Sequence, residues 1–158
     1  MLGKRERFYA AWISLGVLTL CLFVSAQEKK ITRSRLPPMV EKTVEGLAKN
    51  ATVRGFSQEI EHGVIYYEAA LIVANHHKDF LMDSAGNVVE IEEQVALDSL
   101  PASVQDGLQA MAREGKLLSI ESITKRGKLV AYEAQVLKNG KRIEAQVGPE
   151  GDPLNNQE

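Results

Sequence analysis

The chain has 158 residues, of which 19 are Lys or Arg and 21 are Asp or Glu, giving a formal net charge of −2. It contains a single cysteine, which excludes a fold held together by disulfides within the chain, so a hydrophobic core has to stabilise it. The mild acidity also argues against a nucleic-acid-binding protein, which usually carries a concentrated basic surface.

The first 26 residues have the pattern of a signal peptide. Three basic residues within positions 4–7 precede an uncharged, mostly apolar run over 8–26, which ends in the small residues Ser25 and Ala26. We therefore expect cleavage before Gln27 and export to the periplasm or out of the cell. The alternative is an uncleaved membrane anchor, since 19 residues at about 1.5 Å each nearly cross a hydrocarbon core of about 30 Å.

Removal of residues 1–26 leaves a mature chain of 132 residues without cysteine. It keeps 16 basic and 20 acidic residues, a formal net charge of −4, because three basic residues and Glu6 leave with the signal. Residues 27–35 form a polar linker that includes Lys29 and Lys30. We interpret this basic segment as a solvated tether.

Residues 36–56 and 100–120 begin in the same way, with an offset of 64 positions. Both start with Leu-Pro, and a proline in the first turn of a helix loses no hydrogen bond. Apolar residues then follow at relative positions 0, 4, 7 and 8, which form one stripe of an α-helix. These residues are Val40, Val44, Leu47 and Ala48 in the first copy and Val104, Leu108, Met111 and Ala112 in the second. The pattern predicts two short helices that need a sheet to lie on.

Strands are predicted after each helix. Thr52 to Ile60 and Leu117 to Lys125 are rich in apolar and β-branched residues, and Gly63 and Gly127 mark the turns that follow. Beyond these turns apolar residues alternate, which indicates strands half buried against the helices. The alternating residues are Ile65, Tyr67, Ala69 and Leu71, with Val130, Tyr132, Ala134 and Val136 as their counterparts.

Hairpin turns are predicted at Asn75-His76 and Asn139-Gly140, because Asn and Gly tolerate positive φ values. A third strand follows in each copy. A fourth strand, Val88 to Val95, is expected only in the first copy, since Pro153 and a polar tail end the second.

These patterns predict an α+β fold of two tandem units, 36–95 and 96–154, with a tail at 155–158. In each unit one helix is expected to pack on its own antiparallel sheet of three to four strands. The predicted core lies between helix and sheet. It consists of Val40, Val44, Leu47, Tyr67, Leu71, Phe80, Met82, Val104, Leu108, Met111, Tyr132, Val136, Ile143 and Val147.

A Leu-Pro-x-x-Val helix, a Tyr-Glu-Ala strand and an Asn-Gly or Asp-x-x-Gly hairpin follow one another over 36–154, with Tyr-Glu-Ala at 67–69 and 132–134. In these motifs the chain resembles the PepSY-like family, which is also described as similar to the beta-lactamase inhibitory protein. The resemblance implies an extracytoplasmic α+β module that binds a protein or peptide, with inhibition of this partner as one expected consequence, and that has no chemistry of its own. The chain departs from the pattern at Asn75-His76, where Asn-Gly is usual.

Motifs for catalysis are sparse. The mature chain has no cysteine, no Gly-x-Ser-x-Gly and no phosphate-binding glycine loop, so we expect neither enzyme activity nor a cofactor. The alternative is a metal-handling protein that uses His62, His76 and His77. Adjacent residues of a strand point to opposite faces, however, so we favour a solvated turn and expect no metal site.

The sheet face turned away from each helix is the predicted binding surface. Tyr66, Glu68 and Ile72 in the first unit, with Leu129 and Glu133 in the second, combine an aromatic anchor, apolar groups and a central carboxylate. We expect them to contact an extracytoplasmic protein or peptide. The alternatives are that the two sheets pack on each other or on a second chain through these residues.

Glu90, Glu92 and Glu93, with Glu59 and Glu61, make the first unit acidic. We interpret them as a solvated strand face that discourages edge pairing. The alternative is an acidic patch for a basic partner.

Overall fold

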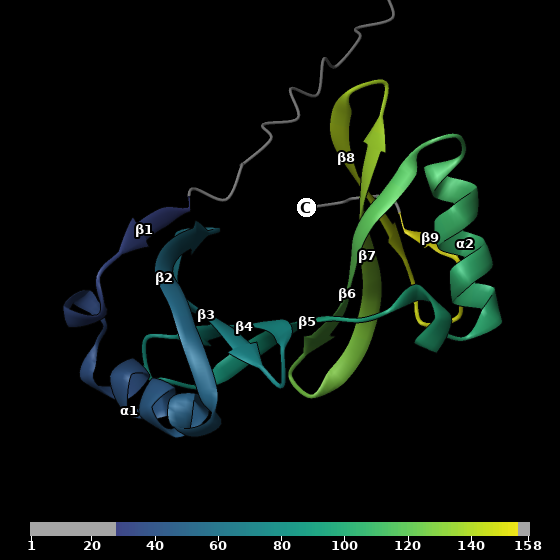
Figure 1. Ribbon diagram of the computed structural model, residues 1–158. Coiled ribbons are helices and arrows are strands. Elements are labelled where there is room, and N and C mark those ends of the chain that lie inside the picture. The colour runs from purple at the N-terminus through teal and green to yellow at the C-terminus, as the bar shows by residue number, and fades with distance from the viewer. Residues whose placement is uncertain (1–27, 155–158) are drawn as a thin grey trace, which may run out of the picture.

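The structure is a computed structural model, and it describes residues 28–154 (Figure 1). The predicted signal peptide and the tail at 155–158 lie outside the described residues. The helices are α1 (Pro38–Leu47) and α2 (Ala102–Ala112), with 3₁₀ turns at Arg33–Arg35, Ala48–Asn50 and Leu97–Ser99. The strands are β1 (Lys29–Ile31), β2 (Ala51–Glu61), β3 (Val64–Val73), β4 (His76–Asp83), β5 (Val88–Gln94), β6 (Lys116–Lys125), β7 (Lys128–Lys138), β8 (Lys141–Val147) and β9 (Pro153–Leu154). Neither of the helices within 28–154 is long and apolar enough to cross a membrane.

The prediction of two separate sheets is wrong, because one continuous nine-stranded sheet runs from β1 to β9 in chain order. The two predicted units are joined where β5 pairs with β6 over five residue pairs, from Glu90 with Lys125 to Gln94 with Glu121. An ion pair of 3.2 Å between the Lys125 ammonium and the Glu90 carboxylate spans this junction. Hydrophobic periodicity shows which side chains face a core but not which backbone edges pair, so it could not show that the sheet continues.

Both helices lie on the same face of this sheet. Tyr132, which packs beneath α2, lies opposite Ser122, and Ser122 lies opposite Glu93. Glu93 is two residues from Ile91, which packs beneath α1, and residues two apart on a strand share a face. In Figure 1 the helices lie on the outer sides of the molecule, and β6 to β8 run at a steep angle to β3 and β4. No helix of residues 28–154 packs on the opposite face, which we call the open face.

The core consists of two hydrophobic clusters, one under each helix. Val40 and Val44 of α1 pack on one part of the sheet, and Val104 and Leu108 of α2 on another. Their buried partners are Leu36, Ala69, Leu71, Phe80 and Met82 in the first cluster and Leu100, Ala112, Ile120, Tyr132, Ala134, Val136, Ala145 and Val147 in the second. The predicted amphipathic stripes therefore face the sheet.

Four residues of the predicted core are less buried than expected. Leu47, Tyr67 and Met111 are only partly buried, although they pack against the clusters. Ile143 is 41% exposed. It lies opposite Val136, near the free end of the β7–β8 hairpin, where the strands extend beyond the helix.

The sheet ends in two short strands that the sequence did not predict. The segment 27–35, expected to be a polar linker, contains β1, whose residues Lys29 to Ile31 pair with Gln58 to Phe56. At the other end, Pro153 and Leu154 form β9 and pair with Val147 and Gln146. Strands this short leave almost no periodic pattern in the sequence, so they are found only through their pairing partners.

The β7–β8 turn lies at Asn139-Gly140 as predicted, with φ values of 51° and 75°. The β3–β4 turn lies one residue earlier than predicted, at Ala74-Asn75, with φ values of 48° and 70°. Pairing of Val73 with His76 fixes this position, because it leaves two residues for the turn. His76 is consequently the first residue of β4 rather than part of the turn.

Candidate binding face

The open face is rich in carboxylates that come from six neighbouring strands. We call them the acidic row: Glu59 of β2, Glu68 of β3, Asp79 of β4, Glu92 of β5, Glu121 of β6 and Glu133 of β7. Strand alternation puts them there, because residues such as Phe80 and Ile91, next to Asp79 and Glu92, point toward α1. Register then aligns the row, with Asp79 opposite Glu92 and Glu121 opposite Glu133.

The carboxyl group of Glu68 has a pKa raised well above its ordinary value. Burial raises its pKa to about 8, and a hydrogen bond with the Glu59 side chain and the charges of Asp79, Glu59 and Glu28 act in the same direction. Burial also raises the pKa of Glu59, although the hydrogen bond with Glu68 opposes that shift. The two carboxyl groups therefore share a proton between β2 and β3.

Glu92, at the centre of the row, has the same property. Burial raises its pKa to about 8, with further contributions from the charges of Glu121, Glu90, Glu133 and Asp79. Burial likewise raises the pKa of Glu121 above its ordinary value. In Glu59, Glu68, Glu92 and Glu121, burial and neighbouring negative charge therefore both act against ionisation.

Some carboxylates in or beside the row have partners. The Glu90 carboxylate pairs with Lys125, and the Gln146 amide donates a hydrogen bond of 2.6 Å to the Glu133 carboxylate. On the helix side of the same strands, Lys78 and Glu93 form an ion pair of 2.7 Å.

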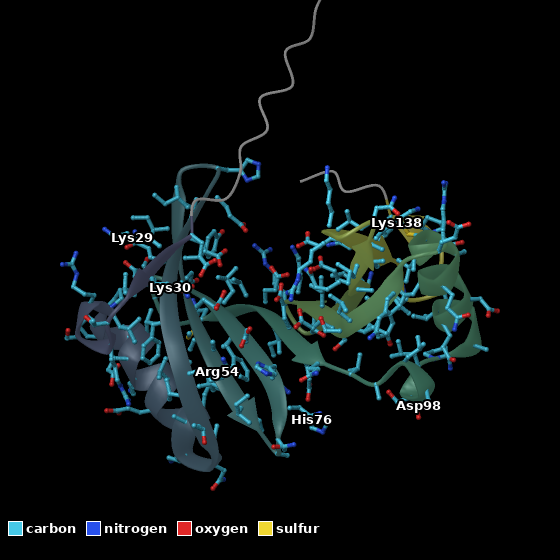
Figure 2. All side chains as sticks on the ribbon, turned by 45° about the horizontal axis from the view of Figure 1, so that its top comes forward. Lys29, Lys30, Arg54, His76, Asp98 and Lys138 are labelled. Carbon is cyan, nitrogen blue, oxygen red and sulfur yellow. The ribbon has the colours of Figure 1, made fainter. Side chains whose placement is uncertain are left out.

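A hollow of about 300 Å³ opens on the first half of the open face, and we call it the Ser57 hollow. Strands β1 to β4 and the residue before β1 line it with Glu28, Lys30, Arg54, Gly55, Phe56, Ser57, Glu68, Ala70, His77 and Asp79. The basic side chains of Lys30 and Arg54 are exposed at its rim, and an Arg54 guanidinium nitrogen lies 3.3 Å from Nε2 of His77. Figure 2 shows Lys30 and Arg54 on the same half of the molecule, with polar side chains between the two halves of the sheet.

Two buried polar atoms in this hollow have no hydrogen-bond partner among the described residues. One is Oγ of Ser57, a residue only 2% exposed, and the other is Oδ1 of Asp79. Burial raises the pKa of Asp79, against the effects of a hydrogen bond from the Leu71 backbone and the charges of His77 and Arg54. Buried polar atoms without partners carry a free-energy penalty, which a ligand that supplies donors would remove.

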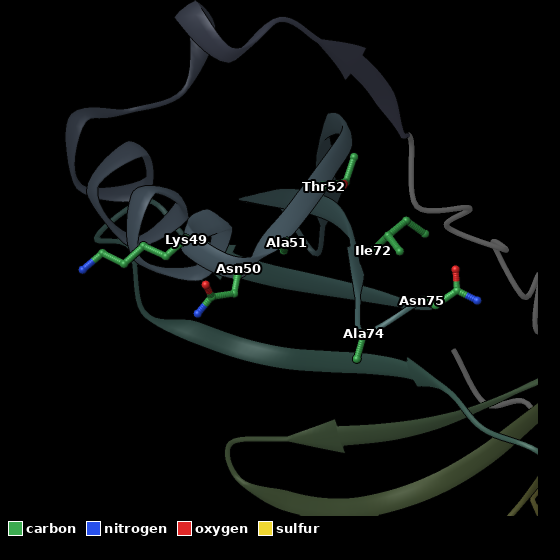
Figure 3. A pocket seen from close by; sticks show the side chains of 7 residues that line it. All are labelled: Lys49, Asn50, Ala51, Thr52, Ile72, Ala74 and Asn75. Atoms are coloured by element: carbon green, nitrogen blue, oxygen red, sulfur yellow. The ribbon is translucent and has the colours of Figure 1, made fainter.

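A second hollow, of about 430 Å³, lies at the other end of β2 and β3. Its lining residues are Lys49, Asn50, Ala51, Thr52, Ile72, Ala74 and Asn75. Figure 3 shows that the side chains of Lys49 and Asn75 point away from each other and do not converge on a common point. Without converging polar groups this hollow is a weaker candidate for a ligand site.

Of the predicted binding residues, Tyr66, Glu68 and Ile72 share the open face of β3, and Glu133 lies on the same face of β7, four strands away. Leu129 does not belong to this face, because it packs against the cluster under α2. Ile123 pairs with Ala131 but Thr124 with Leu129, so β7 has one extra residue between Leu129 and Ala131 and Leu129 turns to the helix side.

The structure does not bring the three histidines together. His62 lies in the turn between β2 and β3, at one end of β3. His76 and His77 begin β4 and lie beside the other end of β3. His76 pairs with Val73 and His77 with Ile72, so the two side chains point to opposite faces of the sheet. Within residues 28–154 no group of three His, Cys, Asp or Glu side chains is arranged to hold a metal ion.

Sequence reasoning missed the residues that form the Ser57 hollow. Lys30 lies in a segment whose sequence predicts a polar linker, and β2 shows no clean alternation because its register shifts between Val53 and Gly55. Along β2, Ser57, Glu59 and Glu61 alternate with Phe56 and Gln58. This alternation was the available signal for a polar face of the strand.

No protein-family profile matches the chain, and no curated protein sequence matches it. Solved structures do match. A candidate periplasmic protein from Bacteroides eggerthii has a TM-score of 0.62 and 17% identity, covering 76% of this chain and 86% of its own. A DUF2874 family protein from Bacteroides ovatus has a TM-score of 0.59 and 17% identity, covering 76% of this chain and 85% of its own.

A BLIP-like protein from Bacteroides fragilis has a TM-score of 0.54 and 18% identity, covering 74% of this chain and 82% of its own. At these identities the similarity shows the fold, which the chain shares with BLIP-like and DUF2874 proteins.

Proposed function

We propose that this chain is an exported protein that binds an extracytoplasmic protein or peptide through its open face, without catalysing a reaction. The observation that carries the proposal is the open face itself. It is free of any helix of the described residues, and it combines half-buried Tyr66, Ile72 and Leu81 with the acidic row and two unpartnered polar atoms. An apolar centre with polar groups that lack partners is what an interface requires before its partner arrives.

The fold supports this proposal by analogy. The Bacteroides fragilis structure is described as BLIP-like, and the sequence motifs of this chain resemble the PepSY-like family. Both point to recognition of another polypeptide rather than to chemistry. Inhibition of an enzyme would be one outcome of such binding.

The proposed location rests on the signal-peptide pattern of residues 1–26. The Bacteroides eggerthii structure, a candidate periplasmic protein, is in line with it. N-terminal sequencing of the protein expressed in a bacterial host tests the location. We expect the mature chain to begin at Gln27 in the soluble envelope fraction, and an intact Met1 in the membrane fraction would contradict this.

The binding proposal is tested with the mature protein immobilised and exposed to the envelope extract of its source organism. Tyr66→Ala combined with Ile72→Ser alters the open face, whereas Met39→Ser alters an exposed apolar residue on α1. We expect the wild type and the Met39 variant to capture the same proteins, identified by mass spectrometry, and the double variant to lose them. Circular dichroism has to show that all three are folded.

A folded double variant that captures the same proteins would contradict the proposal. If the double variant unfolds, the milder Tyr66→Ser alone is used for the same comparison.

A further inference from the structure

We propose that the open face receives a positively charged segment of a polypeptide, and that one arginine or lysine side chain of this segment enters the Ser57 hollow. The inference rests on the proposed function and adds the chemistry of the partner. It also changes the interpretation of the acidic strands, from a solvated surface to a recognition surface.

The first argument is the charge of the central strands. Within residues 28–154, the carboxylates of Glu59, Glu68, Asp79, Glu92 and Glu121 form no ion pair. Lys125, which lies opposite Glu90 where β5 and β6 meet, already pairs with that residue. A cationic partner would therefore meet five carboxyl groups that are in no ion pair among the described residues, and charge complementarity of this kind selects partners.

The second argument is the floor of the hollow. Ser57 is almost completely buried, and its Oγ and the Asp79 Oδ1 lack partners. An oxygen such as Asp79 Oδ1 needs a donor, and ammonium and guanidinium groups supply three and five N–H donors. A carboxylate ligand would bring only acceptors and would leave Asp79 Oδ1 without a partner.

The basic residues of the hollow do not reverse this assignment. Lys30, Arg54 and His77 are exposed, so they lie at the rim in contact with solvent, whereas Glu68 and Asp79 are partly buried below them. Charges in water are screened more than charges at a buried floor. A side chain that reaches the floor is therefore selected by the carboxylates rather than by the rim.

The raised pKa values of Glu68 and Glu92 agree with this arrangement. Each carboxyl is kept neutral by burial and by neighbouring negative charge. A bound cation would compensate for both effects and allow the carboxyl to ionise.

The test uses a fluorescein-labelled ten-residue peptide in which arginine alternates with serine, and a matched peptide with glutamate in place of arginine. Fluorescence anisotropy measures binding to the mature protein at pH 8.5, above the pKa of about 8 of Glu68 and Glu92. We expect the arginine peptide to bind and the glutamate peptide not to bind. Stronger binding of the glutamate peptide would overturn the charge assignment while leaving the open face as a binding surface.

A matched pair of variants separates a site from general attraction to an acidic protein. In the site variant Glu68→Gln, Asp79→Asn and Glu92→Gln are combined, and these near-isosteric changes leave the packing intact. We expect its dissociation constant for the arginine peptide to rise roughly tenfold.

In the control variant Glu45→Gln, Asp98→Asn and Glu114→Gln remove three exposed carboxylates that lie outside the open face. We expect it to bind the arginine peptide nearly as the wild type does. Equal losses in the two triple variants would overturn the proposal, because they would mean that only net charge matters.

The hollow is tested with Ser57→Ala, for which Ser34→Ala at an exposed position is the control. We expect Ser57→Ala to weaken binding of the arginine peptide severalfold, since the buried hydroxyl contacts the entering side chain. Unchanged binding in Ser57→Ala would show that the arginine does not enter the hollow and would overturn that part of the proposal. The envelope-capture experiment tests whether the open face binds a protein, and the peptide measurements test whether the bound segment is positively charged. Either can fail without the other, so the two proposals are separable.

Discussion

Glu68 on β3 and Glu59 on β2 are hydrogen-bonded to each other through their carboxyl groups, with Glu68 as the protonated partner. The proton remains because burial and surrounding negative charge disfavour a second ionised group at this position. At pH 7 the open face therefore carries less negative charge than its sequence suggests, and the charge it carries depends on pH.

Stability is expected to fall as the pH rises. Glu68 and Glu92 have ordinary pKa values of 4.5, which apply to the unfolded chain, and values of about 8 in the folded protein. Their contribution to folding is fully present below pH 4.5 and is lost as the pH rises through 8, because the unfolded state releases these protons first. Urea-unfolding midpoints at pH 5, 7 and 9 measure the effect.

Glu68→Gln and Glu92→Gln should flatten this dependence and raise the midpoint at pH 9, whereas Glu45→Gln on an exposed part of α1 should leave the slope unchanged. A wild-type midpoint that increases between pH 7 and 9 would contradict the assignment of these protons.

Binding of the arginine peptide is expected to strengthen between pH 7 and 9 and to release protons. The charges that raise the pKa of Glu68 are those of Glu59, Asp79 and Glu28. The charges that raise the pKa of Glu92 are those of Glu121, Glu90, Glu133 and Asp79. The cations His77 and Arg54 act in the opposite direction, on the pKa of Asp79. A cation favours the ionised form of both carboxyls. Calorimetry in two buffers with different ionisation enthalpies measures the released protons, and the site variant should release fewer. Proton uptake on binding would be the opposite result.

Alanine is expected to have opposite effects at the two helical glycines. A Cβ at Gly107 of α2 would overlap with the carbonyl of Gly151, which crosses the helix closely, whereas a Cβ at Gly46 of α1 would meet nothing within 4 Å. Gly107→Ala should therefore destabilise the protein by about 1–3 kcal/mol. Gly46→Ala should stabilise it by about 0.5–1 kcal/mol, because alanine favours a helix more than glycine does. Thermal unfolding distinguishes the two, and equal effects would refute the close contact.

Truncation of Leu71 and of Ile143 should separate the core from the exposed end of the sheet. Leu71 is fully buried under α1, so Leu71→Ala should reduce the free energy of unfolding by about 2–5 kcal/mol. Ile143 is largely outside the core, and Ile143→Ala should reduce it by about 0.5 kcal/mol or less. Equal losses in urea denaturation would mean that the face assignment of β3 or β8 is wrong.

The helices and most strands could be predicted because their side chains repeat with the period of the element. Val40 and Val44 are buried as the helical stripe requires, and Asn139-Gly140 forms the turn that its φ preferences favour. The junction between β5 and β6 could not be predicted, since it depends on backbone hydrogen bonds that any sequence can form. The face of Leu129 could not be predicted either, because it depends on the one unpaired residue that the register shift at Ile123 leaves in β7.

The candidate site was predicted in part for similar reasons. Alternation along β3 placed Tyr66, Glu68 and Ile72 on one face, and the structure agrees. The Ser57 hollow needs β1 to β4 to be adjacent, and β1 is too short to be recognised before its pairing with β2 is known. Burial of Ser57 follows from that adjacency and not from its local sequence.

The two ends of the sheet have a consequence for how the protein behaves in a crowded compartment. β1 has three residues, two of them lysines, and β9 has two, one of them a proline without an amide hydrogen. Long, regular edges promote polymerisation into fibrils, and short charged or proline-containing strands oppose it. The open face can therefore be exposed for recognition while the edge strands β1 and β9 disfavour pairing with other copies of the protein. Exposure of the sheet for a partner then does not become a route to aggregation.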